Sequence, residues 1–220
     1  MKKPAFYHWI DQEQAARKQH VEIARITGIG TGRMLDIGAG DGTYLGYFQQ
    51  QGWECLGIET DEHLIRKSFQ EHEVLMLQGH PAELGLPRNS YDIVRIRGIL
   101  STDDNPLQIL KIAYEAVTPT GYIIAETWNK KGGIINPEPK ETEPRFDKNT
   151  LTELFRQAGF DIGGIIAPAV GDEIWCPWKK NQHKLSFPAR FINTISGLID
   201  RGPLLVIFAQ RPPEHSQEKF

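Results

Sequence analysis

The chain has 220 residues, and its 25 lysines and arginines against 28 acidic residues give a net charge of −3 and a pI of about 6.2. This length predicts one domain, 1–220, with a sizeable core. The weak net charge argues against nucleic acid or an anionic membrane as a partner. The N-terminus lacks a signal-peptide pattern, and no stretch has the length of a membrane span. The cysteines Cys55 and Cys176 lie far apart, so we expect a cytoplasmic protein with a free thiol at Cys55.

Apolar periodicity predicts helices and strands that alternate along the chain. The expected helices are 11–27, 42–51, 61–70, 105–117 and 148–158. The expected strands are 33–37, 53–58, 73–77, 91–96, 121–127, 159–166 and 204–210. Because most of the strands are apolar runs, the pattern indicates a parallel sheet with helices on both faces.

The most informative stretch is MLDIGAGDGTYL, residues 34–45, which predicts a buried strand, a glycine turn and a helix start. Glycines at Gly38, Gly40 and Gly42 permit a tight turn and a close approach of a ligand. Asp36 stands at the end of the strand, where its carboxylate would repel a pyrophosphate. An acid at this place suits a ligand with a cationic end, such as the ammonium of S-adenosylmethionine, although it could also serve only as a strand-end cap.

A second acid, Glu59, ends the next expected strand and lies where it can accept hydrogen bonds from two ribose hydroxyls. The dinucleotide fingerprint G-x-G-x-x-G is not met, because its last position is Thr43. A dinucleotide-dependent oxidoreductase is therefore disfavoured. Two acids at neighbouring strand ends instead indicate a nucleoside with a cationic group.

On these motifs the sequence resembles the class I S-adenosylmethionine-dependent methyltransferases, in particular their small-molecule members. The similarity continues in order through LQGHPAELGLPRNSYDIV (77–94), RIRGIL (95–100), VTPTGYIIAETWN (117–129), FDKNTLTELFRQAGFDIGGI (146–165) and LLVIFAQRP (204–212). The resemblance implies an α/β, Rossmann-like, doubly wound sheet of seven strands, mostly parallel with an antiparallel last strand. It also implies S-adenosyl-L-methionine as the cofactor.

The resemblance assigns cofactor-binding roles residue by residue. The methionine portion would lie against Asp36, Gly38, Ala39 and Gly40, and against Arg97 and Gly98 at the end of the fourth strand. Glu59 would hold the ribose, and Thr60 would line the adenine pocket beside His80 and Pro81. Asp61 is expected to cap the next helix.

Two of these positions leave alternatives open. His80 stands where relatives commonly carry aspartate, so it either accepts from the adenine through a neutral ring nitrogen or points away while the backbone near Pro81 and Ala82 forms the pocket. Arg97 either lies beside the cofactor or pairs with an acid.

No metal site and no general base are predicted. The stretch 98–102 lacks the acidic and histidine cluster with which related O-methyltransferases bind a divalent metal. Asp103 and Asp104 are expected to be a helix N-cap and a first-turn charge. The catalytic residues therefore stay unknown, which is compatible with methyl transfer because a base is needed only when the nucleophile must lose a proton.

The expected organisation is an N-terminal helical cap at 1–30, a cofactor-binding core at 31–166, a lid insertion at 167–203 and the final strand at 204–212. A loop as long as 167–203 usually has a functional role. The sequence predicts in-line, metal-independent methyl transfer to a small-molecule acceptor. The alternatives are a non-catalytic cofactor-binding module and an enzyme acting on protein or RNA. The oligomeric state is left open.

Overall fold

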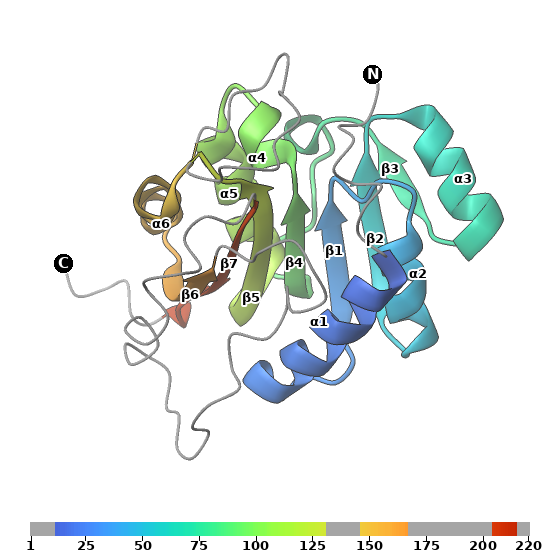
Figure 1. Cartoon of the computed structure of the whole chain (residues 1–220), viewed down its shortest axis with the longest axis horizontal. Coiled ribbons are helices and arrows are strands. Elements are labelled where there is room, and N and C mark those ends of the chain that lie inside the picture. Colours follow the sequence, from blue (N-terminus) through green and yellow to red (C-terminus); the bar gives the residue numbers. More distant parts are fainter. Residues whose placement is uncertain (1–11, 131–145, 167–203, 215–220) are drawn as a thin grey trace.

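The computed structural model describes residues 12–130, 146–166 and 204–214, which form a seven-stranded sheet with helices on both faces (Figure 1). The helices are α1 (Gln12–Thr27), α2 (Thr43–Gln50), α3 (Glu62–His72), α4 (Ile99–Thr102), α5 (Pro106–Ala116) and α6 (Lys148–Gln157), with a 3₁₀ turn η2 (Pro81–Glu83). The strands are β1 (Arg33–Ile37), β2 (Glu54–Glu59), β3 (Met76–Gln78), β4 (Tyr91–Arg97), β5 (Val117–Trp128), β6 (Asp161–Ile166) and β7 (Leu204–Gln210). None of the described helices has the length and apolar character that crossing a bilayer requires.

The strand order is β3-β2-β1-β4-β5-β7-β6, and β7 runs antiparallel to both of its neighbours. The predicted fold class and the antiparallel last strand are confirmed. The order reverses between β1 and β4, so the crevice outside the carboxyl ends of these strands is where open α/β sheets bind ligands. Asp36 on β1 lies directly beside Arg95 on β4 in the parallel register.

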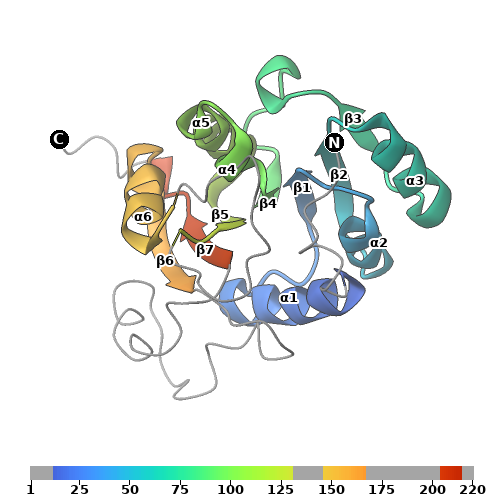
Figure 2. The same ribbon diagram turned by 45° about the horizontal axis from the view of Figure 1, so that its top comes forward.

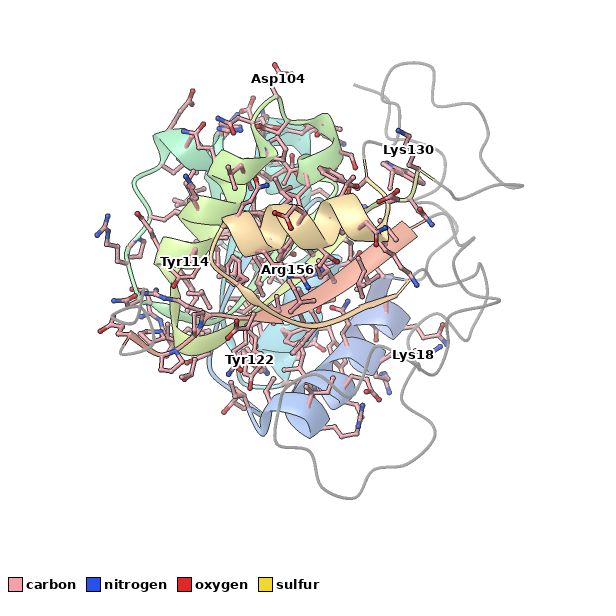
Figure 3. The ribbon with its side chains drawn as sticks, turned by 90° about the vertical axis from the view of Figure 1, so that its left-hand side faces the viewer. Lys18, Asp104, Tyr114, Tyr122, Lys130 and Arg156 are labelled. Carbon is pink, nitrogen blue, oxygen red and sulfur yellow. The ribbon has the colours of Figure 1, made fainter. Side chains whose placement is uncertain are left out.

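The two faces of the sheet carry different helices (Figure 2). Helices α1 and α2 pack on the face formed by Met34, Ile93, Ile124 and Phe208. Helices α5 and α6 cover the other face, where the core is built on alternate residues of the same strands, such as Leu35 and Val94. Figure 3 shows α6 lying across the sheet, with Asp104 after β4 and Lys130 after β5 toward the same edge and Tyr122 toward the opposite one.

The observed boundaries differ from the predicted ones mainly at β5 and at β3, which begins at Met76 instead of residue 73, and the start of α5 differs by one residue. Strand β5 begins at Val117 instead of residue 121, because Val117 pairs with Tyr91 before the chain passes Thr120, whose φ is 66°. The prediction that Asp103 or Asp104 caps α5 is wrong. The cap is Asn105, whose side chain accepts from Gln108 N at 3.2 Å, because Pro106 opens the helix one residue later.

Other local predictions are confirmed. Asp61 is the N-cap of α3 and accepts from His63 N at 2.9 Å. Cys55 on β2 is a free thiol. The lid expected at 167–203 and the first part of the N-terminal cap, 1–11, lie outside the described residues.

Candidate functional site

The glycine turn after β1 is tied to the end of β2, since Gly38 N and Ala39 N both donate to Ile58 O, at 2.9 and 3.1 Å. Gly38 and Gly40 adopt φ values of +83° and +65°, which favour glycine. Their surroundings differ. A Cβ on Gly38 would overlap the carbonyl oxygen of Arg97, whereas a Cβ on Gly40 would meet nothing within 4 Å. Gly38 is therefore needed for packing against β4, and Gly40 leaves open space over the turn.

Asp36 is completely buried at the end of β1. Its Oδ2 accepts from Arg95 Nη1 at 2.8 Å, while Oδ1 has no hydrogen-bond partner among the described residues. Burial raises the pKa of Asp36, and the guanidinium groups of Arg95 and Arg97 offset only part of that rise. One carboxylate oxygen of this acid is thus held by the protein, and the other remains available to a donor.

Glu59 closes over the glycine turn from the end of β2. Its Oε2 accepts from Gly40 N at 2.9 Å, and its Oε1 accepts from Thr60 N at 2.8 Å and Asp61 N at 3.1 Å. A carboxylate has about four acceptor positions, so Oε2 can take one further hydrogen bond. The side chain is fixed by backbone donors and keeps capacity for a hydroxyl group.

His80 uses both ring nitrogens within the protein. Nδ1 accepts from Ala82 N at 3.3 Å and caps η2, so the proton lies on Nε2, which is 2.6 Å from Asp103 Oδ2. Pro81 is buried at the first position of η2. The ring therefore fixes the loop after β3 to the loop after β4. Because both ring nitrogens are used within the protein, a ligand could contact only the flat face of the imidazole.

Arg97 and Gly98 end β4 beside the turn. Arg97 Nε lies 3.5 Å from Glu126 Oε2, and Arg97 Nη1 donates to Gln12 Oε1 on α1. The alternative that Arg97 pairs with an acid is therefore confirmed. Gly98, with a φ of 76°, donates from its backbone to the carbonyl oxygen of Glu126 at 2.9 Å.

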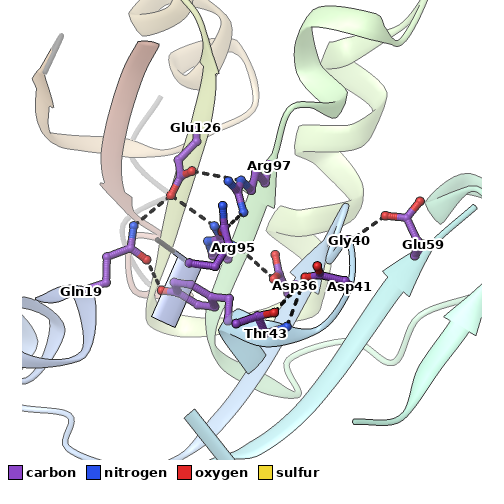
Figure 4. Close-up of polar contacts among 11 residues, drawn as sticks. Gln19, Asp36, Gly40, Asp41, Thr43, Glu59, Arg95, Arg97 and Glu126 are labelled. Atoms are coloured by element: carbon purple, nitrogen blue, oxygen red, sulfur yellow. Dashed lines mark hydrogen bonds and ion pairs between the residues drawn. The ribbon is translucent and has the colours of Figure 1, made fainter. Parts of the chain in front are cut away.

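The sequence reasoning missed a buried polar network beneath these residues (Figure 4). Arg95 donates to Asp36 and, at 3.3 Å, to Glu126 Oε1, which also accepts from Gln19 Nε2 at 2.9 Å. The Cζ of Arg95 lies 3.7 Å from the ring centroid of Tyr44, whose hydroxyl donates to Gln19. The sequence did contain a signal for this network, because charged residues interrupt the apolar strands VRIR (94–97) and IIAET (123–127). The strand prediction did not use these charges.

The two acids of this network differ in how fully they are compensated. Burial would raise the pKa of Glu126, but Arg95, Arg97 and Gln19 together lower it below its ordinary value. Burial would lower the pKa of Arg95, but Asp36 and Glu126 raise it, so the guanidinium stays charged. Glu126 is thus a firmly ionised structural acid, and Asp36 is the less satisfied one.

The fold brings most of the predicted residues to one edge of the sheet. Asp36, the turn 38–40, Glu59 and the pair 97–98 meet at the carboxyl ends of β1, β2 and β4. Thr60, His80 and Pro81 lie on the loops that follow β2 and β3. In the ranges that the structure describes, no three His, Cys, Asp or Glu side chains are grouped so that they could hold a metal ion.

Comparisons with known proteins agree with this geometry. A sequence model of the family described as methyltransferase domain matches residues 10–163. A SAM-dependent methyltransferase from Archaeoglobus fulgidus superposes with a TM-score of 0.65 at 19% identity, covering 90% of this chain and 94% of that one. A SAM-dependent methyltransferase from Thermotoga maritima, a possible histamine N-methyltransferase, gives 0.64 at 19% identity and covers 94% of each chain. The [4+2]-cyclase SpnF also gives 0.64, at 16% identity, covering 90% of this chain and 82% of that one.

The structural likenesses show the fold, and the family match covers more than half of the chain. The glycine turn with Asp36 and Glu59 stands inside the matched region. The chain therefore belongs to the class I S-adenosylmethionine-dependent methyltransferases, and S-adenosyl-L-methionine is its cofactor.

Proposed function

We propose that the protein transfers a methyl group from S-adenosyl-L-methionine to a small-molecule acceptor by in-line displacement, without a metal ion. The observation that carries the proposal is Asp36 Oδ1, a buried carboxylate oxygen without a partner among the described residues, on the strand that leads into the glycine turn. A buried polar atom of this kind needs a donor. The ammonium of the methionine portion is such a donor.

The residues present fit the remaining parts of the cofactor. Glu59 keeps acceptor capacity for a ribose hydroxyl, and Thr60 follows it on the loop. The loop that His80 holds, with Pro81, would contact the adenine. Gly38, Ala39, Gly98 and the backbone of Arg97 would surround the methionine portion from the ends of β1 and β4.

The bound cofactor supplies an electrophilic methyl group, and the chain's contribution is to hold and orient. Asp36 and Glu59 would fix the two ends of the ligand, since both acids are themselves held by hydrogen bonds. Alignment of nucleophile and methyl is the main source of rate in such a displacement. No side chain is assigned as a base, because an acceptor that reacts as a neutral nucleophile loses its proton after transfer.

The net charge of −3 supports a small acceptor over a nucleic acid. Helix α1 supports it too, because Gln12 at the start of this helix contacts Arg97 at the end of β4, so a helix of the chain's own begins beside the site. The proposal includes one domain over 1–220, with 167–203 as the lid.

The first test is calorimetric titration with S-adenosylmethionine, S-adenosylhomocysteine, NAD and NADP. We expect micromolar binding of the two sulfur nucleosides alone, and loss of at least tenfold in Asp36→Asn. The matched control is Asp161→Asn, the same change at an exposed residue that begins β6 at the far edge of the sheet, which should bind as the wild type does. Equal affinity of Asp36→Asn and wild type would remove the assigned role of Asp36.

The second test separates the kinds of acceptor. Purified protein is incubated with methyl-labelled cofactor and a fractionated cell extract, and the label is followed into small molecules, protein and RNA. Label in the small-molecule fraction supports the proposal. Label in protein or RNA would mean that the acceptor is a macromolecule and not a small molecule. Cofactor binding without any transfer would favour a non-catalytic cofactor-binding module.

A further inference from the structure

Arg95 occupies an unusual place for a charged residue, in the interior of the central strand β4. Its side chain is only 2% exposed, and its neighbours in the register are Asp36 on β1 and Ile124 on β5. Burying a guanidinium is costly, and well-packed apolar residues often serve stability equally well. The retention of this charge in the core therefore points to a role other than packing.

Arg95 contacts only one of the two carboxylate oxygens of Asp36. Nη1 holds Oδ2 at 2.8 Å, and Nη2 reaches Glu126 Oε1 at 3.3 Å, so the guanidinium is anchored on the far side from the glycine turn. The ring of Tyr44 packs against the plane of the guanidinium and prevents it from turning. The Asp36 carboxylate is thereby fixed with Oδ1 as its one oxygen without a partner among the described residues.

The charges of the network also single out Asp36. Among the described residues, two guanidinium groups, Arg95 and Arg97, face two carboxylates, Asp36 and Glu126. Glu126 contacts both guanidinium groups and Gln19, whereas the hydrogen bond of the Asp36 side chain within the described residues is with Arg95. Loss of Arg95 would raise the pKa of the buried Asp36 further, and a neutral carboxyl does not pair with an ammonium.

We propose that Arg95 is a positioning residue for the cofactor: it holds Oδ2 of Asp36 and so leaves Oδ1 for the ammonium of the methionine portion. Arg95 itself does not touch the ligand and acts through Asp36. The inference rests on the proposed function, because it assigns the ammonium to Asp36. It adds that recognition of the amino-acid end depends on a residue in the core of the sheet.

The charged and titratable groups that face Asp36 come from four elements. They are Arg95 and Arg97 on β4, Glu126 on β5, Tyr44 on α2 and Cys55 on β2. Tyr44 and Cys55 are neutral at the pH of the test because burial raises the pKa of each. Arg95 stays charged in the wild type, so a change in the pH dependence of ligand affinity on removing it reports on Asp36.

The test uses Arg95→Met, which keeps the length of the side chain and removes its charge. The probes are S-adenosylhomocysteine, which carries the ammonium, and 5′-methylthioadenosine, which has the same nucleoside without the amino-acid end. We expect Arg95→Met to weaken the first by tenfold or more relative to the wild type at pH 6.5, and by less at pH 8.5, because a carboxyl with a raised pKa is ionised more fully as the pH rises. Binding of 5′-methylthioadenosine should stay as in the wild type.

Two further variants make the result decisive. Arg95→Lys restores a positive charge and should bind S-adenosylhomocysteine with a weaker dependence on pH than Arg95→Met does. It also keeps the test valid if Arg95→Met folds poorly. Adding Asp36→Asn to Arg95→Met should abolish the pH dependence. Equal weakening of both probes would mean that Arg95 has a structural role only, and no weakening of either would also overturn the inference. If the wild type binds 5′-methylthioadenosine but gains nothing from the amino-acid end, the proposed role of Asp36 fails instead.

Discussion

At the residue scale, two glycines of the turn, Gly38 and Gly40, have different roles: one packs against the protein, and the other borders open space. Gly38 touches the backbone of β4 so closely that no side chain fits, and Gly40 faces open space with its amide held by Glu59. The two glycines share a left-handed backbone and differ in what surrounds them. Their substitution therefore distinguishes stability from binding.

We predict that Gly38→Ala destabilises the protein strongly, since strain of about 1–2 kcal/mol from the backbone adds to overlap with Arg97 O. Gly40→Ala should lose only the stability that this backbone strain costs, and it should fold. Its methyl group would enter the space assigned to the cofactor. Thermal unfolding and titration with S-adenosylhomocysteine measure the two effects. A Gly40→Ala protein with unchanged affinity would contradict the assignment of this space.

Glu126 gives the second prediction at this scale. Glu126→Gln should lower the free energy of unfolding at pH 7 by about 3–5 kcal/mol, because it leaves the buried Arg95 and Arg97 undercompensated. Since the folded-state pKa of Glu126 lies below its ordinary 4.5, its contribution is full above that value and is lost as the pH falls through the lowered pKa. Urea unfolding at pH 7 and pH 3.5 should show the gap between variant and wild type narrowing in acid. A constant gap would mean that the charge of Glu126 is not responsible.

At the element scale, several helices begin at a side chain that accepts from their own first turn. Asp61, Asn105 and Asp147 cap α3, α5 and α6, and Asp147 forms a reciprocal capping box with Thr150. The described chain resumes at residue 146, after the undescribed residues 131–145. The cap at Asp147 then sets the start of α6. The cap and the apolar face of Leu151 and Phe155 together seat α6 on the sheet.

We predict that Asp147→Ala lowers stability by about 1 kcal/mol, or roughly 2–4 °C in Tm, because it leaves Thr150 N without its acceptor. Asp147→Ser should restore most of the loss, since serine caps helices well. Differential scanning calorimetry of the three proteins measures this. Cofactor affinity should not change, and a change would show that α6 is coupled to the site.

At the scale of the whole molecule, the protein buries a cluster of charges under the edge of the sheet that we propose as the cofactor site, and β2 lies beside this cluster. Burial, together with the charge of Asp36, raises the pKa of the Cys55 thiol to about 12. A thiolate at this position is therefore scarce in the folded state at neutral pH. Cys55 is half-buried, so its reactivity reports any opening of the structure that exposes this thiol.

We predict that Cys55, in a Cys176→Ser background, reacts with Ellman's reagent at pH 8 at least a hundredfold more slowly than a free thiol. Saturating S-adenosylhomocysteine should slow it further, because a ligand that binds only the folded state lowers the open population. Urea should restore the full rate. A fast reaction of the native protein would mean that the thiol is not protected by burial.

Much of this architecture was predictable from local patterns. The alternation of apolar runs and amphipathic segments predicted the seven strands to within about four residues, and MLDIGAGDGTYL predicted the site's turn. The predicted boundaries were wrong where contact with a residue distant in the sequence decides the secondary structure. Val117 is a strand residue because Tyr91 lies beside it, and α4 is too short for periodicity to reveal.

The sequence by itself determined the order and kind of the elements, the glycine turn and the two acids at the strand ends, because these depend on backbone freedom and on patterns within a few residues. Only the tertiary structure decided which charges meet. Asp36, Arg95 and Glu126 are separated by 59 and 31 residues along the chain, and the strand order places them side by side in the buried core. In that environment the compensation of each charge depends on its spatial neighbours, and for this reason the role of Arg95 emerges from the fold and not from its place in the sequence.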